Sequence, residues 1–393
     1  MSEYPPDWEV ANLGTYLKET KERVSEGNTT PYSVSKVLGI VPQSEKFKKR
    51  VASNDISNYK IIRKGDFAYD PMLLWDGSIN RMLREDTGAV SPAYVTFRVL
   101  DNSLDADYLL HFLKADTAKN FYKSISKGTN VRRQKAEFRD FASGEFAFPP
   151  LPEQKKIAEI LSGIDRVIYS TSTARDRLFL LKKSLCLKLL ATESKQCRQS
   201  KFSDVCIKIQ DGTHFSPQSK DGNCLYITSK NIRPGRLDLS SINWISTEEH
   251  NTIYKRCQVQ KGDILLTKDG ANTGNACLNT LEEEFSLLSS VAFLRPNPSY
   301  CDANYMLQWI MSVAFQNEIQ QEMSGNAISR LTLTKINNLS ISLPPLEKQK
   351  EIAETLLSID NQCKSYESKI DSFQMLKQAI SADLLSGRKR VSI

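Results

Sequence analysis

Short apolar runs alternate along the chain with longer stretches of helical periodicity. Runs rich in Val, Ile, Leu, Phe and Tyr, bounded by Gly, Asp or Asn, fall at residues 60–70, 93–100, 224–232, 263–270 and 289–296. Because such runs between turn-forming residues are typical of strands, we predict strands and hairpins there. Residues 108–122 and 305–323 have the apolar spacing of amphipathic helices. Each half of the chain is therefore expected to be an α+β domain.

The two halves repeat each other over most of their length. Three blocks recur at a shift of 197 residues: KGD at 64–66 and 261–263, YVTFR at 94–98 with VAFLR at 291–295, and DADYLLHFL at 105–113 with DANYMLQWI at 302–310. A fourth block, PPLPEQKKIAEILSGID from Pro149, matches PPLEKQKEIAETLLSID from Pro344 at a shift of 195, with eleven of seventeen positions identical. These ordered matches predict two tandem copies of one unit.

The stretch after each proline pair carries a coiled-coil pattern. Its apolar residues are spaced alternately four and three positions apart, which is the seam of paired helices rather than one broad face. The seam residues are Ile157, Leu161, Ile164, Ile168, Leu178, Leu185 and Leu189 in the first copy, and Ile352, Leu356, Ile359, Cys363, Tyr366, Ile370, Phe373, Lys377, Ile380 and Leu384 in the second. Since neither helix can bury its stripe alone, we predict two helices of about 40 residues that pair antiparallel.

These patterns divide the chain into four parts. Residues 1–148 and 198–343 form two mixed domains, and residues 149–197 and 344–393 form the two long helices. The expected fold class is thus α+β, with two tandem pseudo-symmetric domains separated by two helices that pair as an antiparallel coiled coil. Such a pair of helices would act as a rigid spacer between two similar domains.

The composition favours a nucleic-acid partner and no membrane. A net charge of +7, from 53 Lys and Arg against 46 Asp and Glu, favours a polyanionic partner. The eight cysteines form no CxxC pair, which argues against a zinc site or a disulfide framework. The segment MSEYPPDWEV lacks the pattern of a signal peptide, and no apolar run reaches the roughly 20 residues needed to cross a bilayer. We therefore expect a cytoplasmic protein.

Catalytic motifs are not found in the sequence. A DNA adenine methylase needs an [DN]PP[YF] motif to hold the flipped base, and the sequence contains no such motif. The GANTG segment at 270–274 lacks the lysine of a phosphate-binding loop and is expected to be a turn. His111 lies in an apolar helix and is expected in the core, whereas His250 lies in a polar stretch and is expected to be solvated. The sequence predicts no catalytic, cofactor-binding or metal-binding residues.

Basic and amide side chains gather instead in loops at the ends of the predicted elements. Arginine forks and amides can read guanine and adenine edges in the major groove, and lysines contact phosphates. Charged loops are also common on surfaces that bind nothing, so each residue is a separate hypothesis. The candidate DNA-binding residues are Lys127, Asn130, Arg132, Arg133, Lys135, His214, Lys230, Asn231, Arg233, Lys268, Asn272, Asn326, Arg330 and Lys335.

The duplicated PPL-x-x-Q segment, the KGD strand in each half and a G-x-x-x-x-R loop before each long helix resemble the specificity subunits of type I restriction-modification systems. The resemblance spans essentially the whole chain. It implies that each mixed domain is a target-recognition domain for one half of a bipartite DNA target, and that the conserved helices set the gap. Because the two halves differ outside the shared blocks, we expect an asymmetric target rather than a palindrome.

The resemblance also implies partners. These would be double-stranded DNA, two modification (methyltransferase) subunits docked along the conserved helices, and restriction (motor-nuclease) subunits. S-adenosylmethionine and ATP would bind those subunits, and this chain would hold no cofactor. Arg133→Ala is then expected to weaken DNA binding and leave methyltransferase assembly intact.

Two alternatives stay open at this point. The first is a stand-alone tandem-domain DNA-binding regulator or architectural protein, and the second is a fused nuclease or methylase. A neighbouring gene with an NPPF-type methylase motif would favour the specificity subunit, and a lone gene would favour the regulator. Methylation or cleavage of DNA by the purified chain alone would favour the enzyme.

Overall fold

The computed structural model describes most of the chain. The described residues are 4–24, 29–36, 38–47, 51–53, 55–84, 87–100, 104–126, 135–193, 197–218, 221–324 and 330–392. The chain divides into two compact units: unit 1 is Met1–Thr171 with Ser368–Ile393, and unit 2 is Ser172–Glu367. The unit boundaries fall inside the two long helices, so each unit contains a part of both.

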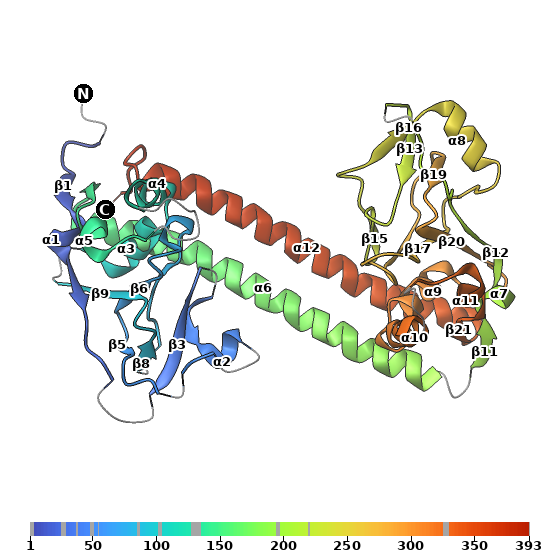
Figure 1. Cartoon of the computed structure of the whole chain (residues 1–393), viewed down its shortest axis with the longest axis horizontal. Coiled ribbons are helices and arrows are strands. Elements are labelled where there is room, and N and C mark those ends of the chain that lie inside the picture. The colour runs from blue at the N-terminus through green and yellow to red at the C-terminus, as the bar shows by residue number, and fades with distance from the viewer. Residues whose placement is uncertain are drawn as a thin grey trace. The chain divides into compact units, whose positions relative to one another are not determined.

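Unit 1 combines small sheets with short helices (Figure 1). Its elements before the first long helix are β1 (Glu9–Asn12), α1 (Leu13–Tyr16), β2 (Leu17–Thr20), β3 (Thr30–Ser35), β4 (Gly39–Pro42), α2 (Gln43–Lys46), β5 (Lys60–Ile62), β6 (Phe67–Tyr69), the 3-10 helix η1 (Leu74–Asp76), β7 (Ile79–Arg81), β8 (Gly88–Val90), β9 (Val95–Val99), α3 (Ala106–Leu113), α4 (Asp116–Ile125), α5 (Phe138–Ala142) and β10 (Glu145–Phe148). The first long helix is α6 (Leu151–Glu193).

Unit 2 has the same plan, and its elements are β11 (Arg198–Lys201), α7 (Phe202–Val205), β12 (Cys206–Asp211), β13 (Cys224–Ile227), β14 (Ile232–Arg233), β15 (Arg236–Leu237), β16 (Asn243–Ile245), α8 (Thr247–Tyr254), β17 (Ile264–Thr267), β18 (Ala276–Leu278), β19 (Phe285–Leu287), β20 (Val291–Pro296), α9 (Ala303–Ile310), α10 (Val313–Ser324), α11 (Leu333–Asn338) and β21 (Ser340–Leu343). The second long helix is α12 (Leu346–Leu384).

Most strands of the sheets of unit 1 have a counterpart in unit 2. A four-stranded sheet has the order β2-β9-β6-β7 in unit 1 and β12-β20-β17-β18 in unit 2. Beside it, the parallel pair β3-β8 in unit 1 corresponds to β13-β19 in unit 2, and β4 and β16 pair antiparallel with β3 and β13. Among the described elements, β5 of unit 1 and the β14-β15 hairpin of unit 2 have no counterpart, and α2 of unit 1 and α8 of unit 2 each follow an equivalent strand. The tandem repeat predicted from the sequence is therefore a repeat of the fold.

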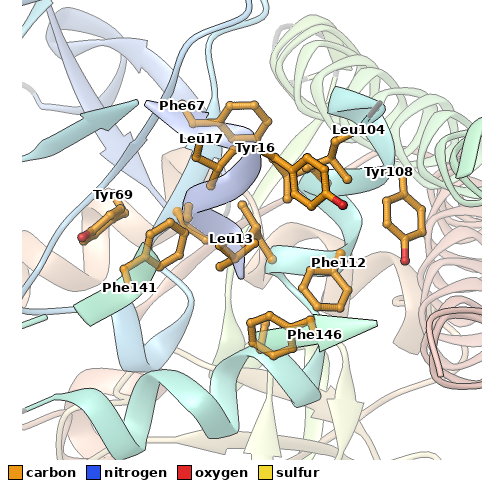
Figure 2. Close-up of a cluster of buried hydrophobic side chains, with 14 of the residues drawn as sticks. Leu13, Tyr16, Leu17, Phe67, Tyr69, Leu104, Tyr108, Phe112, Phe141 and Phe146 are labelled. Carbon is orange, nitrogen blue, oxygen red and sulfur yellow. The ribbon is translucent and has the colours of Figure 1, made fainter. Parts of the chain in front are cut away.

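The core of unit 1 is rich in aromatic side chains. Figure 2 shows part of it, where Phe67 and Tyr69 of β6 lie with Phe112 of α3 and Phe141 of α5. Burying rings of this size is a major source of stabilisation, at roughly 25 cal/mol per Å² of apolar surface. The first turns of α6 and the last turn of α12 belong to the same core, through Leu161 and Leu384 among others. The equivalent core of unit 2 takes in the last turns of α6 and the first turns of α12.

The KGD block forms the same tight turn in both units. Gly65 has a φ of +93°, a backbone conformation that glycine adopts without strain. The turn directs the carboxylate of Asp66 to the Arg63 N–H, at 3.0 Å, and to the guanidinium of Arg98 on β9, at 3.2 Å. One ion pair thus joins two of the repeated blocks. The equivalent residues of unit 2 are Gly262, Asp263, Gln260 and Arg295.

A buried glutamine joins the other two blocks. Gln154 in the first turn of α6 donates to the carbonyl oxygen of Pro149 at 2.8 Å and accepts the N–H of Asp105 at 2.7 Å. Asp105 in turn caps α3 by accepting the N–H of Tyr108. This amide therefore fixes the start of the long helix against the start of α3. The equivalent residues of unit 2 are Gln349, Pro344, Asp302 and Tyr305.

In each unit the two long helices run antiparallel. In unit 1, Asp165 of α6 accepts the amine of Lys377 of α12 at 2.6 Å, and Glu153, nearer the start of α6, pairs with Arg390, beyond the end of α12. In unit 2, Lys182 of α6 pairs with Asp360 of α12 at 2.7 Å. Each residue of one Asp–Lys pair lies 195 positions from its counterpart in the other, so the contact is reciprocal between the two repeats.

The predicted helices and their seam are confirmed. Both long helices lie within the predicted spans 149–197 and 344–393, and all the predicted seam positions are buried or half-buried. Thr171 and Arg175, polar residues that lie between Ile168 and Leu178 of the first seam, are half-buried as well. Among the helices of the described residues, none combines the length and apolarity required to cross a membrane.

Candidate nucleic-acid interface

Part of the candidate set lies outside the residues that the structure describes. These residues are Lys127, Asn130, Arg132, Arg133 and Asn326. Their DNA contacts stay predictions. The remaining candidates lie in described ranges, and most of them belong to unit 2.

In unit 2 the DGTH segment is a turn at the end of β12. Gly212 lies so close to β19 that a Cβ there would be 2.0 Å from the carbonyl oxygen of Leu287, so glycine is required. The next residue, Thr213, is buried and donates its N–H to the same carbonyl oxygen at 2.8 Å. The turn therefore fixes the positions of the flanking residues Asp211 and His214.

Asp211 is a buried carboxylate with three basic neighbours. Nη2 of Arg256 donates to its Oδ1 at 3.2 Å, while Nζ of Lys268 and Nε2 of His214 lie 3.3 Å and 3.4 Å from its Oδ2. Lys268 is buried, whereas the side chains of Arg256 and His214 are 58% and 59% exposed. These four residues, the Asp211 cluster, thus present two basic side chains to the surface around a buried ion pair.

Hydrogen bonds connect the segments of two more candidates, Lys230 and Arg330, to Lys268 of the Asp211 cluster. The N–H of Lys268 donates to the carbonyl oxygen of Ser290. The hydroxyl of Ser290 accepts the N–H of Ser229, which precedes the exposed Lys230. The carbonyl oxygen of Lys268 accepts the N–H of Leu331, the residue after the exposed Arg330. Candidates that are far apart in the sequence, His214, Lys230 and Arg330, therefore meet around one strand end.

Two candidates have structural roles instead. Asn231 is buried, its amide nitrogen donates to two backbone carbonyls, and its oxygen accepts the N–H of Thr228. A base contact by Asn231 would require breaking these bonds, so the structure does not support that prediction. Arg233 pairs with Asp238 at 3.3 Å. Hydrogen bonds from Ser240, followed by the one from Arg233, lower the pKa of Asp238 to about 2.

The other described candidates of unit 2 are Lys335, Lys268 and Asn272. Lys335 donates to the backbone carbonyl of Glu322, which joins α11 to the end of α10. Lys268 is buried, and its amine lies 3.3 Å from Oδ2 of Asp211, so its DNA contact stays a prediction. Asn272 lies in the GANTG segment, where positive φ angles at Gly270 and Gly274 confirm the predicted turn.

Unit 1 carries a different basic group at the equivalent strand end. Lys21 and Arg23 follow β2, and Arg23 forms an isolated bridge with Lys60. Burial lowers the pKa of Lys60, and although Glu19 opposes this, the nearby charges of Lys21, Arg23 and Lys135 lower the pKa further. The exposed candidate Lys135 therefore lies near other basic side chains, and its amine is 3.9 Å from a carboxylate oxygen of Glu137.

Two of the three histidines, His111 and His250, are buried. The prediction that His250 is solvated is wrong: it is buried, its Nδ1 lies 3.0 Å from the hydroxyl of Ser286, and its ring stacks on Tyr254. His111 is buried as predicted, with Nε2 at 2.9 Å from the hydroxyl of Ser162. Within the described ranges, no three His, Cys, Asp or Glu side chains are grouped to hold a metal ion.

A second surface feature lies on the part of α6 that belongs to unit 2, where apolar side chains outside the seam are exposed. Large exposed side chains of this kind are typical of surfaces that bind another protein. Phe179 and Leu180 are each 64% exposed. These two residues, together with Leu181 and Leu187, are called the apolar row.

Comparison with known proteins gives these surfaces a context. A family model for the type I restriction modification DNA specificity domain matches residues 9–178 and 195–372, which together make up most of the chain. The chain belongs to the type I restriction modification DNA specificity family. Each matched segment runs through one mixed domain and into the long helix that follows, so the repeated unit is the family's domain.

Individual specificity subunits are similar to the whole chain or to part of it. The chain is 27% identical over 414 residues to the type I restriction enzyme MjaVIII specificity subunit of Methanocaldococcus jannaschii, covering 98% of this chain and 94% of that protein. The EcoBI specificity subunit of Escherichia coli is 27% identical over 141 residues, which cover 36% of this chain and 29% of that protein. The crystal structure of an S subunit from M. genitalium has a TM-score of 0.60 at 13% identity, covering 98% of this chain and 96% of that one.

The family and these structures confirm the predicted fold class and the predicted specificity-subunit assignment. Arg256 is a residue that the sequence reasoning missed. It lies just after α8 in a short KRC segment without a motif, and its partner Asp211 is 45 positions away. A contact of this kind becomes visible only in the folded chain.

Proposed function

We propose that the chain is the DNA sequence-specificity subunit of a type I restriction-modification complex, and that its two units read the two parts of an asymmetric bipartite target. The observation that carries this proposal is one skeleton used twice with different basic groups at the same strand end, Lys21 and Arg23 in unit 1 and the Asp211 cluster in unit 2. A shared skeleton suits two readers of one kind of ligand. Different side chains at the strand ends suit two different DNA sequences.

The chemistry of the complex is proposed to reside on partner subunits. Two methyltransferase subunits would bind S-adenosylmethionine and methylate adenine, and restriction subunits, where present, would use ATP. The chain itself would hold no cofactor and act in the cytoplasm. Membership in the specificity family and the net charge of +7 support a DNA-binding rather than a catalytic role.

The apolar row on α6 is proposed as the docking surface for the methyltransferase subunits. Burying the exposed ring of Phe179 and the leucines of the apolar row would supply the apolar core of an interface. The row lies on the long helix rather than at the strand ends that carry the basic groups, so docking and DNA reading would use separate surfaces. Substitution on one surface should therefore leave the other function intact.

The proposal is tested by assembling the complex from purified subunits. The chain alone should neither methylate nor cleave DNA, and adding the modification subunits should produce adenine methylation. Phe179→Ser with Leu180→Ser should abolish co-purification of the methyltransferase subunits without unfolding the chain, whereas Lys135→Ala should leave co-purification unchanged. Methylation or cleavage by the chain alone, or full complex formation by the double variant, would contradict the corresponding part of the proposal.

A further inference from the structure

The Asp211 cluster holds its carboxylate in a fixed place. The backbone at Gly212 is packed against β19, so the strand end that carries Asp211 cannot shift outward. On the inner side, the buried amine of Lys268 lies 3.3 Å from Oδ2 and offsets the charge of the carboxylate. A fixed carboxylate of this kind can orient the side chains that bind to it.

Arg256 is the exposed side chain that this carboxylate orients most directly. Its Nη2 donates to Asp211 Oδ1, while more than half of the side chain stays exposed to a ligand. The bond limits the rotation of the guanidinium plane, which a flexible surface arginine would otherwise have. His214 approaches the other carboxylate oxygen and is exposed beside it.

A carboxylate beside an arginine favours base reading over phosphate binding. Because Lys268 offsets the charge of Asp211, the effect of the carboxylate on Arg256 is to orient it, and an arginine that only clamps the DNA backbone does not require a fixed orientation. The two parallel bonds to N7 and O6 of guanine require a guanidinium fork in one orientation, and an acidic neighbour supplies that orientation. Unit 1 has Lys21 at the position of Asp211, so it has no carboxylate at this place to orient an arginine.

We propose that Arg256 reads a guanine in the part of the DNA target bound by unit 2, and that Asp211 is a positioning residue that orients Arg256 for this contact. The inference rests on the proposed function, since it requires that unit 2 binds one part of a DNA target. Lys268 then acts through Asp211 rather than by touching DNA. His214 extends the same basic surface.

The test measures base preference rather than overall affinity. The full complex with its modification subunits is mixed with a duplex that carries the methylated site found for the wild-type protein, and with duplexes in which each guanine of the site is replaced in turn. The wild-type complex should discriminate against replacement of one guanine in one half-site by ten- to a hundredfold, on the order expected for a bidentate contact. Arg256→Lys keeps the charge but removes the fork, so it should abolish this discrimination and leave the other half-site unaffected.

Two further variants separate orientation from charge. Asp211→Asn removes the charge that holds Arg256 and should weaken the same discrimination without affecting other positions. Lys255→Ala removes one positive charge from the exposed neighbour of Arg256, so it should lower affinity evenly for all duplexes and keep every base preference. Circular dichroism of each variant establishes that the chain has folded.

The outcomes distinguish this inference from the proposed function. If Arg256→Lys keeps every base preference, or if Arg256→Ala lowers affinity equally for all duplexes, the guanine contact is excluded while the DNA-binding role stands. A target without guanine in either half would also exclude it. If the wild-type complex shows no sequence preference at all, the proposed function itself fails.

Discussion

Units 1 and 2 are alike where the fold is held together and different where the strands end. Both have a four-stranded sheet with the same strand order, the same KGD turn with its Asp–Arg pair, and the same glutamine at the start of the long helix. These contacts lie between the repeated sequence blocks. The sequence blocks that repeat are therefore those that make the contacts needed to build one unit.

The strand ends follow a different rule. Counting from the shared strand pairing, Lys21 of unit 1 takes the position of Asp211 in unit 2, and Pro71 takes that of Lys268. The backbone is unchanged, because the Pro71 carbonyl oxygen accepts the N–H of Ala136 just as Lys268 accepts that of Leu331. The comparison teaches that side chains at this end vary without cost to the scaffold, which is what a reader of variable DNA sequences requires.

The largest expected difference between the units concerns the KGD ion pair. Asp263→Ala would leave the guanidinium of Arg295, only 20% exposed, without its carboxylate and should destabilise unit 2 by about 3 kcal/mol. Asp66→Ala should cost unit 1 about 1 kcal/mol, because Arg98 is 44% exposed and can bind water instead. Denaturant unfolding followed by hydrogen exchange in each unit measures both values. Equal losses would show that burial does not set the strength of this pair.

The next difference concerns pH. In unit 1, His111 of α3 and Lys114, the residue after α3, face the Asp165–Lys377 pair, and Gln308 and Met311 stand at the equivalent positions of unit 2. Burial, followed by the charge of Lys377, lowers the pKa of His111 to about 4 and that of Lys114 to about 8. Unfolded unit 1 therefore binds more protons than the folded unit between pH 4 and 6.5 and between pH 8 and 10.5. Its free energy of unfolding should rise with pH in both windows.

Matched variants test this pH dependence. As the pH falls from 6.5 to 4, His111 should lower the free energy of unfolding of unit 1 by about 2 kcal/mol. His111→Gln should abolish this decrease. Lys114→Met should flatten the alkaline window and raise the stability of unit 1 at pH 7 by about 1 kcal/mol. Unfolding curves at stepped pH, with hydrogen exchange on α9 of unit 2 as the internal control, give both results. The account fails if the variants keep the wild-type pH profile.

The smallest expected effects come from the two reciprocal helix pairs. Lys182→Asp places two carboxylates together and should destabilise unit 2 by about 1 kcal/mol, since the pair is partly exposed. Adding Asp360→Lys restores the pair with reversed charges and should recover the loss. Thermal unfolding of the single and double variants supplies the comparison. No recovery in the double variant would mean that the pair does not act through its charges.

The long helices, the repeat and the general class could be predicted because they depend on local patterns. The four-three spacing from Ile352 to Leu384 fixes a helix and its buried side without knowledge of the partner, and the repeated blocks needed only alignment of the chain with itself. The ends of the strands were predicted less well. Asn231 has the residue type of a base reader, but its amide is filled by backbone groups.

Burial from contacts distant in the sequence explains the other differences. His250 lies in a polar segment but packs against Ser286 of β19, and Lys268 is buried by Asp211, which comes 57 positions earlier. The importance of Arg256 depends on the same Asp211. A local pattern carries no record of such pairs, whereas His214, Lys230 and Arg330 could be proposed from their polar loops alone.

The most direct measurement of the central claim is a map of methylated adenines in the genome of a cell that expresses this chain with its modification subunits. Two units with one skeleton and different strand ends predict a site with two specific parts of unlike sequence, and a change in only one part when Arg256 is replaced. A palindromic site, or a site that stays the same when this chain is absent, would contradict the account.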